Sequence, residues 1–187
     1  MSVVERLLHR PTHGDGLEIA PMRRRDLRRG VMEIEAEAYP TGWSANVFGS
    51  EIDQMRGGTR HYAVARRRGE IVGYAGLWFA VDEAHVTNVA VRPDARRQGV
   101  ARRLMLHLAD VAIARGCTAW TLEVRVGSTG AQEMYDRFGF RSAGIRQRYY
   151  DNTEDAIVMW CHDIQSEGYR SRLDALAAPT EVSRGRD

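Results

Sequence analysis

The segment that most constrains the fold runs from Val86 to Arg115. Its first part alternates like a strand and ends at Arg92-Pro93, and its last part, from Val100, has the apolar spacing of a long helix. Between them lies a short basic loop with a glycine, Arg96 to Ala101. The first N–H groups of a helix have no partner inside the helix, and the helix dipole adds positive character there. The strand, loop and helix together therefore predict a site for phosphate oxygens at this loop.

Apolar periodicity predicts the other elements. We predict strands over 17–22, 60–67, 70–81, 86–91, 119–124, 141–148 and 155–161, and helices over 26–38, 45–55, 100–115 and 128–137. Asp26 and Ser44 are the expected N-caps of the first two helices, and Arg68-Gly69 is the expected turn of a hairpin. The early strands pair as hairpins and the middle ones alternate with helices, which predicts an α/β fold: a mixed sheet with helices on both faces.

Length and composition suit one domain. The 187 residues are 43% hydrophobic and 28% charged. We expect a flexible leader over 1–16, a domain over 17–163 and a tail over 164–187 with a short helix carrying Tyr169, Leu173 and Leu176. No apolar run is long enough to span a bilayer, no signal peptide is visible, and two cysteines make no disulfide framework. These features predict a cytoplasmic protein without a membrane partner.

Charge limits the candidate ligands. The net charge is +2, all 27 basic residues are arginine, and no aromatic residues interleave the arginine clusters, so nucleic-acid binding is not expected. The scattered His9 and His13 lack the spacing of metal ligands, so a metal site is not expected. A Walker loop needs a lysine, which the chain lacks, and a dinucleotide fingerprint needs a glycine pattern that is absent. The remaining motif, Arg96-x-x-Gly99-x-Ala101, is weak when taken alone.

Its neighbours make it specific. Asn88-Val-Ala-Val-Arg-Pro93 precedes the loop, and Leu122-Glu-Val-Arg125 and Ala131-x-x-x-Tyr135-x-x-x-Gly139-Phe140 follow it. With Ala38-Tyr-Pro-Thr-Gly-Trp-Ser44 and Arg148-Tyr-Tyr150, they make residues 17–159 resemble the GNAT superfamily of acetyl-CoA-dependent N-acyltransferases, particularly the RimI-like ribosomal-protein N-alpha-acetyltransferases. The resemblance implies a mixed, mostly antiparallel sheet of about seven strands.

The resemblance also implies which residues bind acetyl-CoA. The pyrophosphate would be held at the loop by Arg96, Arg97, Gln98, Gly99, Val100, Ala101 and Arg102. The backbone of Val89, Ala90 and Val91 would pair with the pantetheine arm, and one N–H of this strand would polarise the acetyl carbonyl. Ser128 stands where the family usually has an asparagine that touches the cofactor. A serine can still cap the following helix and donate one hydrogen bond, although it reaches less far.

Glu123 and Tyr135 are the candidate catalytic residues. Glu123 lies between two apolar strand residues, so its carboxylate faces the opposite side of the sheet from theirs. An N-terminal amine has a pKa near ~8, against ~10.4 for lysine, so a carboxylate acting through water could serve as its base. The alternative is a structural ion pair with Arg125 or another arginine. The resemblance implies that Tyr135 protonates the departing CoA thiolate and contacts the cofactor; the alternative is a core tyrosine beside Phe138 and Phe140.

The acceptor site is expected around four aromatic residues, which could instead be plain packing: Tyr39, Trp43, Tyr149 and Tyr150. For Glu35 and Glu37 we favour a solvated helix face over contact with the incoming ammonium group. The resemblance implies direct acetyl transfer, in a ternary complex, to the N-terminal amine of a protein such as a ribosomal protein. Two alternatives stay open: an acetyltransferase for a small amine (an antibiotic, polyamine or amino acid) and a non-catalytic CoA-binding module.

Overall fold

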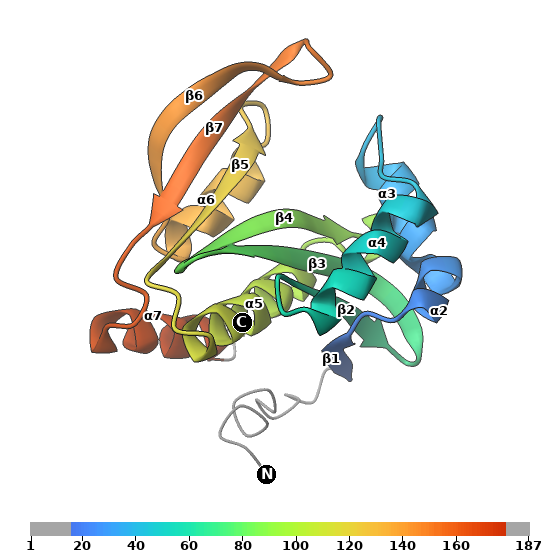
Figure 1. Cartoon of the computed structure of the whole chain (residues 1–187), viewed down its shortest axis with the longest axis horizontal. Helices are drawn as coiled ribbons and strands as arrows, with labels where there is room; N and C mark the ends of the chain where they lie inside the picture. Colours follow the sequence, from blue (N-terminus) through green and yellow to red (C-terminus); the bar gives the residue numbers. More distant parts are fainter. Residues whose placement is uncertain (1–15, 179–187) are drawn as a thin grey trace, which may run out of the picture.

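The computed structural model describes residues 16–178. Apart from Gly16, the predicted leader therefore lies outside the described residues, as does the end of the predicted tail, 179–187. The seven strands form one sheet in the order β1-β2-β3-β4-β5-β7-β6 (Figure 1). Neighbouring strands are antiparallel except β4 and β5, which are parallel. The predicted mixed, mostly antiparallel sheet is confirmed.

The predicted elements are present, with ends that differ by a few residues. The strands are β1 (Leu17–Pro21), β2 (Arg60–Arg67), β3 (Glu70–Ala80), β4 (Glu83–Val91), β5 (Ala119–Arg125), β6 (Arg141–Tyr150) and β7 (Glu154–Cys161). The helices are α2 (Arg24–Asp26), α3 (Met32–Ala38), α4 (Ala45–Arg56), α5 (Val100–Ala114), α6 (Thr129–Arg137) and α7 (Glu167–Ala177). A π-helical turn, η1 (Leu27–Val31), joins α2 to α3, and a 3-10 turn, η2 (Pro93–Ala95), precedes α5.

The start of the first helix differs from the prediction. Arg23 is the N-cap, and Asp26 is the third helical residue, so the predicted Asp26 cap is wrong. The Asp26 carboxylate reaches back to accept the Arg23 N–H at 2.9 Å, as acidic residues at the third position often do. Asp26 is fully buried, and the guanidinium of Arg66 on β2 donates to it at 2.7 Å. Gly30, with φ 138°, then interrupts the helix within η1.

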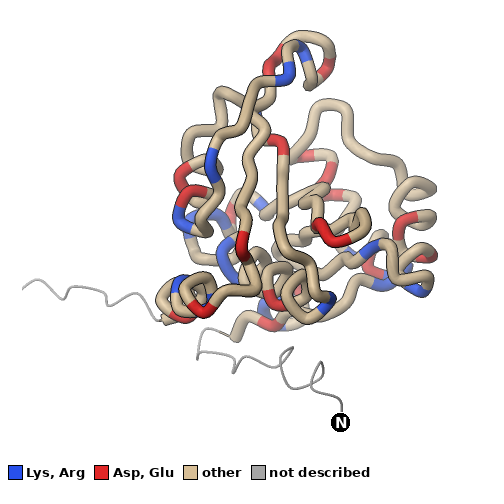
Figure 2. The backbone as a smooth tube through the Cα atoms, turned by 60° about the vertical axis from the view of Figure 1, so that its left-hand side comes forward, with Lys and Arg blue, Asp and Glu red and all other residues tan. Residues whose placement is uncertain are grey.

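Two hydrophobic cores lie on opposite faces of the sheet. One core joins the sheet to α5, α6 and α7, and includes Tyr169 and Leu173 of the predicted tail helix. The second joins the other face to η1, α3 and α4. Figure 1 shows these two groups of helices flanking the sheet, which confirms helices on both faces. Basic and acidic positions are interspersed along the chain (Figure 2).

Strands β4 and β5 pair only over a short length. Their parallel ladder runs from Glu83 opposite Ala119 to Val86 opposite Leu122 and then stops, although both strands continue. Figure 1 shows that β5 diverges from β4, and that β6 and β7 lie beside β5 on the diverging side. We call the point where the pairing ends the β4–β5 fork. The edge of β4 beyond Val86 is therefore free of pairing with β5.

A histidine pair joins the sheet to α5. The Nε2 atoms of His61 on β2 and His107 on α5 lie 2.9 Å apart, a distance that one donor and one acceptor can share when both rings are neutral. Burial lowers the pKa of His61 to about 3 and that of His107 to about 4. The neighbouring imidazole of His107 adds to the effect on His61.

We expect acid to destabilise the protein through this pair. Below pH 6.5 these two histidines become protonated in the unfolded chain, whereas in the folded protein they stay neutral down to about pH 4. The contribution of the pair to the free energy of unfolding is therefore fully present above pH 6.5 and falls as the pH drops. From pH 7 to pH 5 the loss should be on the order of 1–2 kcal/mol per histidine. Thermal unfolding at both pH values measures it, and the double variant His61→Leu/His107→Leu should lose less stability between them. An equal loss in that variant would contradict this assignment.

Candidate active site

The loop before α5 has the backbone shape of an anion site. Arg97 and Gly99 both have positive φ, 61° and 80°, and Gly99 is the N-cap of α5. The first hydrogen bond of the helix runs from the Arg103 N–H to the Gly99 carbonyl at 3.0 Å, so the N–H groups before it point out of the helix end. A left-handed non-glycine residue such as Arg97 is strained, which is common where the backbone shapes a site.

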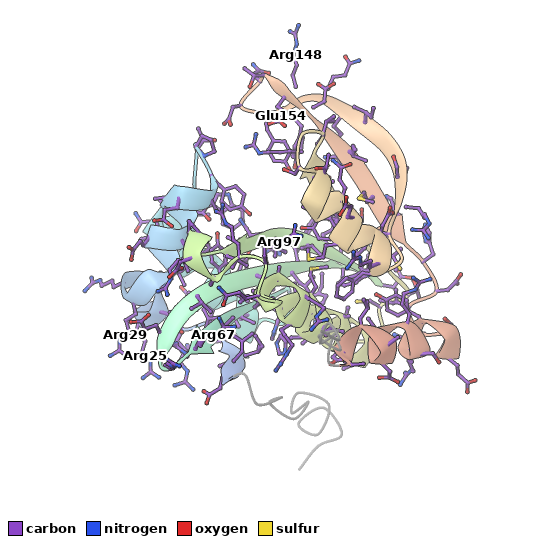
Figure 3. The ribbon with its side chains drawn as sticks, turned by 180° about the vertical axis from the view of Figure 1, so that it is seen from behind. Arg25, Arg29, Arg67, Arg97, Arg148 and Glu154 are labelled. Atoms are coloured by element: carbon purple, nitrogen blue, oxygen red, sulfur yellow. The ribbon has the colours of Figure 1, made fainter. Side chains whose placement is uncertain are left out.

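Side chains hold this loop in place. The Nε of Arg96 donates to the Val91 carbonyl at 3.1 Å, and the Nε2 of Gln98 donates to the Asp94 carbonyl at 2.7 Å. Arg97 lies at the start of α5 (Figure 3). Its Nη1 is 4.0 Å from the position that a Cβ would take at Gly130, in the first turn of α6. The loop thus brings a guanidinium between the starts of α5 and α6.

Alternate residues of β4 direct their backbone N–H and C=O groups toward its open edge. The Arg92 N–H bonds to the Val72 carbonyl of β3 at 2.9 Å, so the backbone of Ala90, two residues earlier, also faces β3. The backbone groups of Val89 and Val91 face the other way, toward the β4–β5 fork. Of the three residues predicted to pair with the pantetheine arm, Val89 and Val91 are therefore the two with their backbone directed there.

Ser128 stands at the N-cap of α6, but its side chain makes no capping hydrogen bond. The predicted cap is therefore wrong for the side chain. Its backbone carbonyl accepts the N–H groups of Ala131 and Gln132, both at 3.1 Å. The Ser128 hydroxyl is not committed to the helix.

Glu123 faces away from the core that contains Leu122 and Val124, as predicted. Its Oε1 lies 3.2 Å from Nη1 of Arg146 on β6, and the Glu123 side chain is 21% exposed. The ion pair of the alternative interpretation is thus present, with Arg146 as its partner. Because the Arg146 side chain is 56% exposed, the pair is a weak one that solvent and other cations can replace.

Tyr135 is buried in the first core, and its ring packs against Phe140 with centroids 5.8 Å apart. Burial raises the pKa of its hydroxyl above the usual value, and the nearby hydroxyls of Tyr39 and Tyr150 raise it further. The phenol therefore keeps its proton in the folded protein. The ring is packed in the core, as expected for a core tyrosine. Its hydroxyl lies near those of two predicted acceptor-site residues, which is compatible with the catalytic interpretation.

Tyr39 and Tyr150 reach the fork from opposite sides. The Tyr39 hydroxyl donates to the Val89 carbonyl at 3.2 Å, and that of Tyr150 donates to the Glu123 carbonyl at 3.0 Å. Burial raises the pKa of Tyr39 to about 12, and the Glu35 carboxylate adds to this rise. The structure therefore brings Tyr39, Tyr150, Glu123 and Tyr135 together.

Trp43 and Tyr149 are less central. Trp43 is partly buried and packs against Phe48 of the second core, with ring centroids 5.5 Å apart. Tyr149 is 46% exposed, and the Arg146 guanidinium lies 5.5 Å from its ring centroid. Trp43 thus shapes its loop through packing, whereas Tyr149 is an exposed residue beside Arg146.

A network joins the loop between α3 and α4 to the β6–β7 turn. The Thr41 hydroxyl hydrogen-bonds to the Asp151 carboxylate in that turn. Arg125 pairs with Glu154 at 2.6 Å and Asp151 at 3.6 Å, and its guanidinium lies 4.1 Å from the Tyr150 ring centroid. Figure 3 shows Glu154 and Arg148 at this end of the hairpin. No local sequence pattern indicates these contacts, because they join distant segments.

Glu35 is buried, which differs from the prediction. It is 2% exposed, so the predicted solvated face is wrong for Glu35 and holds for the exposed Glu37. Its Oε1 accepts the Trp43 backbone N–H at 2.7 Å, and its Oε2 accepts the Tyr74 hydroxyl. Glu35 follows Val31 by four residues, so helical spacing on the apolar face could have identified it.

Comparison with known proteins identifies the family. The acetyltransferase (GNAT) family matches residues 28–140. The chain belongs to this family. A putative ribosomal protein bS18-alanine N-acetyltransferase of Bacillus subtilis is 36% identical to this GNAT protein over 131 residues, which is 70% of this chain and 85% of the relative.

Two further matches come from Escherichia coli. Its ribosomal protein bS18-alanine N-acetyltransferase is 37% identical over 130 residues, 67% of this chain and 84% of the relative. A crystal structure of the E. coli ribosomal-protein-S18-alanine N-acetyltransferase superposes with a TM-score of 0.70 and 33% identity, covering 79% of this chain and 94% of that one. This GNAT protein is thus an N-acetyltransferase of a family that uses acetyl-CoA, and it is similar to RimI-like enzymes.

Two other observations concern residues 16–178. In that part of the chain, no three histidine, cysteine, aspartate or glutamate side chains are grouped so that they could hold a metal ion. None of the helices described there combines the length and the apolar character needed to cross a bilayer.

We expect Glu35 to hold the α3–α4 loop of this GNAT protein. Glu35→Ala leaves the Trp43 N–H and the Tyr74 hydroxyl without their acceptor, which should lower the free energy of unfolding by about 2–4 kcal/mol. Urea denaturation measures this loss. The exposed Glu37→Ala, on the same helix, should change stability by less than about 0.5 kcal/mol. Equal effects of the two substitutions would contradict a specific role for Glu35.

Proposed function

We propose that this protein is an N-alpha-acetyltransferase that moves an acetyl group from acetyl-CoA to the free N-terminal amine of a protein. The observation that carries the proposal is the convergence of Glu123, Tyr135, Tyr39 and Tyr150 beside the open edge of β4. The similarity to bS18-alanine N-acetyltransferases supports a ribosomal protein as acceptor.

The donor side of the site suits CoA. The outward N–H groups at the start of α5, with the left-handed Arg97 and Gly99, would hold the pyrophosphate. The N–H groups of Val89 and Val91 would pair with the pantetheine arm, and one of them would polarise the acetyl carbonyl. Two further groups lie close enough to contact this ligand: the guanidinium of Arg97, and the hydroxyl of Ser128, which makes no capping hydrogen bond. Acetyl-CoA supplies an activated thioester.

Transfer would be direct, within a ternary complex of donor, acceptor and enzyme. Glu123 would take a proton from the acceptor ammonium group, directly or through water, after Arg146 has moved aside. The amine nitrogen then forms a bond to the acetyl carbon as the carbon–sulfur bond breaks. Tyr135, which keeps its proton at neutral pH, would give that proton to the departing thiolate. The nitrogen loses its second proton as the amide forms, and this proton would pass through water to restore the Tyr135 phenol, while Glu123 releases the first proton to solvent. Neither cysteine is placed in this proposed chemistry.

A peptide assay tests the proposal. The protein should transfer one acetyl group to peptides with a free N-terminal Ala, Ser or Thr, detected by mass spectrometry and assigned to the α-amine by fragmentation. Peptides whose N-terminus is blocked by formylation should gain none. Acetylation of a polyamine or an amino acid in place of the peptides would support the small-amine alternative, and CoA binding without turnover would support the non-catalytic one.

Two substitutions test the catalytic assignment. Glu123→Gln removes the proposed base and Tyr135→Phe the proposed acid, and each should lower kcat by about 100-fold. Calorimetric binding of CoA and the melting temperature should stay close to wild type. Glu133→Gln on the exposed side of α6 is the matched control, with unchanged kcat. If kcat were unchanged in both site variants, the assignment would be wrong.

A further inference from the structure

A row of aromatic and histidine rings crosses the sheet next to the fork, on the side where β4 and β5 are still paired. Trp78 of β3 lies 4.8 Å from His85 of β4, and His85 lies 6.3 Å from Trp160 of β7, all between ring centroids. His162 stacks on Trp160 with the planes 4° apart. We call Trp78, His85, Trp160 and His162 the aromatic row. Trp78 is 41% exposed, so the row is open to solvent at the end formed by β3.

The aromatic row lies on the same face of the sheet as Glu123. His85 pairs with Thr121 of β5, and Thr121 pairs with Trp160, so these three residues share a face. Glu123 follows Thr121 by two residues and shares that face too. The row therefore begins about 7 Å from the proposed base, measured along β5. It crosses the sheet where β4 and β5 are still paired.

The opposite end of the acceptor site is bridged. The α3–α4 loop and the β6–β7 turn approach each other there (Figure 1), and Thr41 hydrogen-bonds to Asp151 across the gap. Arg125 ties Asp151 and Glu154 to β5 on the same side. A polypeptide with its N-terminus at Glu123 is therefore blocked at the bridged end and has the aromatic row at the other.

We propose that the aromatic row binds the acceptor polypeptide just beyond its N-terminus. An extended chain advances about 3.3 Å per residue, so its third to sixth residues would pass over His85, Trp160 and Trp78. Indole and imidazole faces favour aromatic rings and guanidinium groups. The chain itself shows this contact, because the Arg60 guanidinium lies 5.4 Å from the Trp78 ring centroid. The inference rests on the proposed function and adds a subsite to it.

Charge favours a peptide over a nucleic acid at this row. A nucleic acid also stacks on aromatic rings, but it needs cations for its phosphates. Arg60 is already paired with Glu51 at 2.6 Å. The partly exposed Glu83 carboxylate lies 3.6 Å from His85, between Trp78 and Trp160 in the row, where it repels phosphate and attracts arginine or lysine. An aromatic or basic peptide segment therefore fits the row better.

Acceptor length provides the test. A tripeptide and an octapeptide would share their first three residues, with arginine and tyrosine at positions four to six of the longer one. Steady-state acetylation by the full-length protein gives KM and kcat for each. In the wild type the octapeptide should have a KM about fivefold lower than the tripeptide. Trp78→Ala should remove most of that difference and leave kcat and the tripeptide KM unchanged. Val81 is fully exposed in the turn between β3 and β4, so the control variant Val81→Ala should behave as wild type.

Each outcome decides a different point. Turnover with equal KM for both peptides, or a Trp78→Ala effect of equal size on both, would overturn the subsite while the proposed function stands. No turnover of either peptide by the wild type would overturn the proposed function and the subsite with it. Fluorescence anisotropy with a single-stranded oligouridine adds a control. Binding that Trp78→Ala abolishes, with peptide kinetics unchanged, would make the row a nucleic-acid surface and refute the peptide subsite.

Discussion

The site depends on the short length over which β4 and β5 pair. Their ladder ends at Val86 and Leu122, and this short contact is what joins the two halves of the sheet. Had the ladder continued, the backbone groups of Val89 and Val91 would bond to β5 and none would be left for a ligand. A register shift beside the end of the ladder, between Gly76 and Leu77 of β3, makes Thr87 an extra residue in β4. Such a bulge bends its strand, which suits a strand that leaves its partner.

The two cores serve the two sides of the fork. The first core packs α5 and α6 on the sheet and so fixes the anion loop, Ser128 and Tyr135, all proposed to contact the donor. The second core packs α3 and α4 and fixes the loop with Tyr39 and Trp43 on the acceptor side. Glu35 couples that loop to the sheet, since it binds both Trp43 and Tyr74. Under the proposed function, acceptor preference would therefore depend on the second core, separately from the groups proposed to hold CoA.

The sequence predicted what local patterns determine. Alternation and helical spacing placed the strands and helices, and Ser44 caps α4 through its hydroxyl as expected. The strand–loop–helix unit identified the loop before α5 because its signal lies within one short segment. Asp26 was misplaced because an acid at the N-cap and one at the third helical position look alike in sequence. The Thr41–Asp151 contact was not predicted, and an arginine partner for Glu123 was expected without being identified as Arg146, because each contact joins residues distant in sequence that only the folded chain brings together.

In the proposed mechanism, the charges around Glu123 would favour a cationic acceptor. The nearby Arg125 is neutralised by Glu154 and Asp151, so it contributes little positive field at the fork. Glu123 itself is paired with the exposed Arg146, a contact that costs little to break. An N-terminal ammonium group can take the place of that guanidinium and keep the carboxylate paired until proton transfer. Under the proposed function, a neutral hydroxyl acceptor would displace Arg146 without replacing its charge, so amines would be the favoured acceptors on electrostatic grounds.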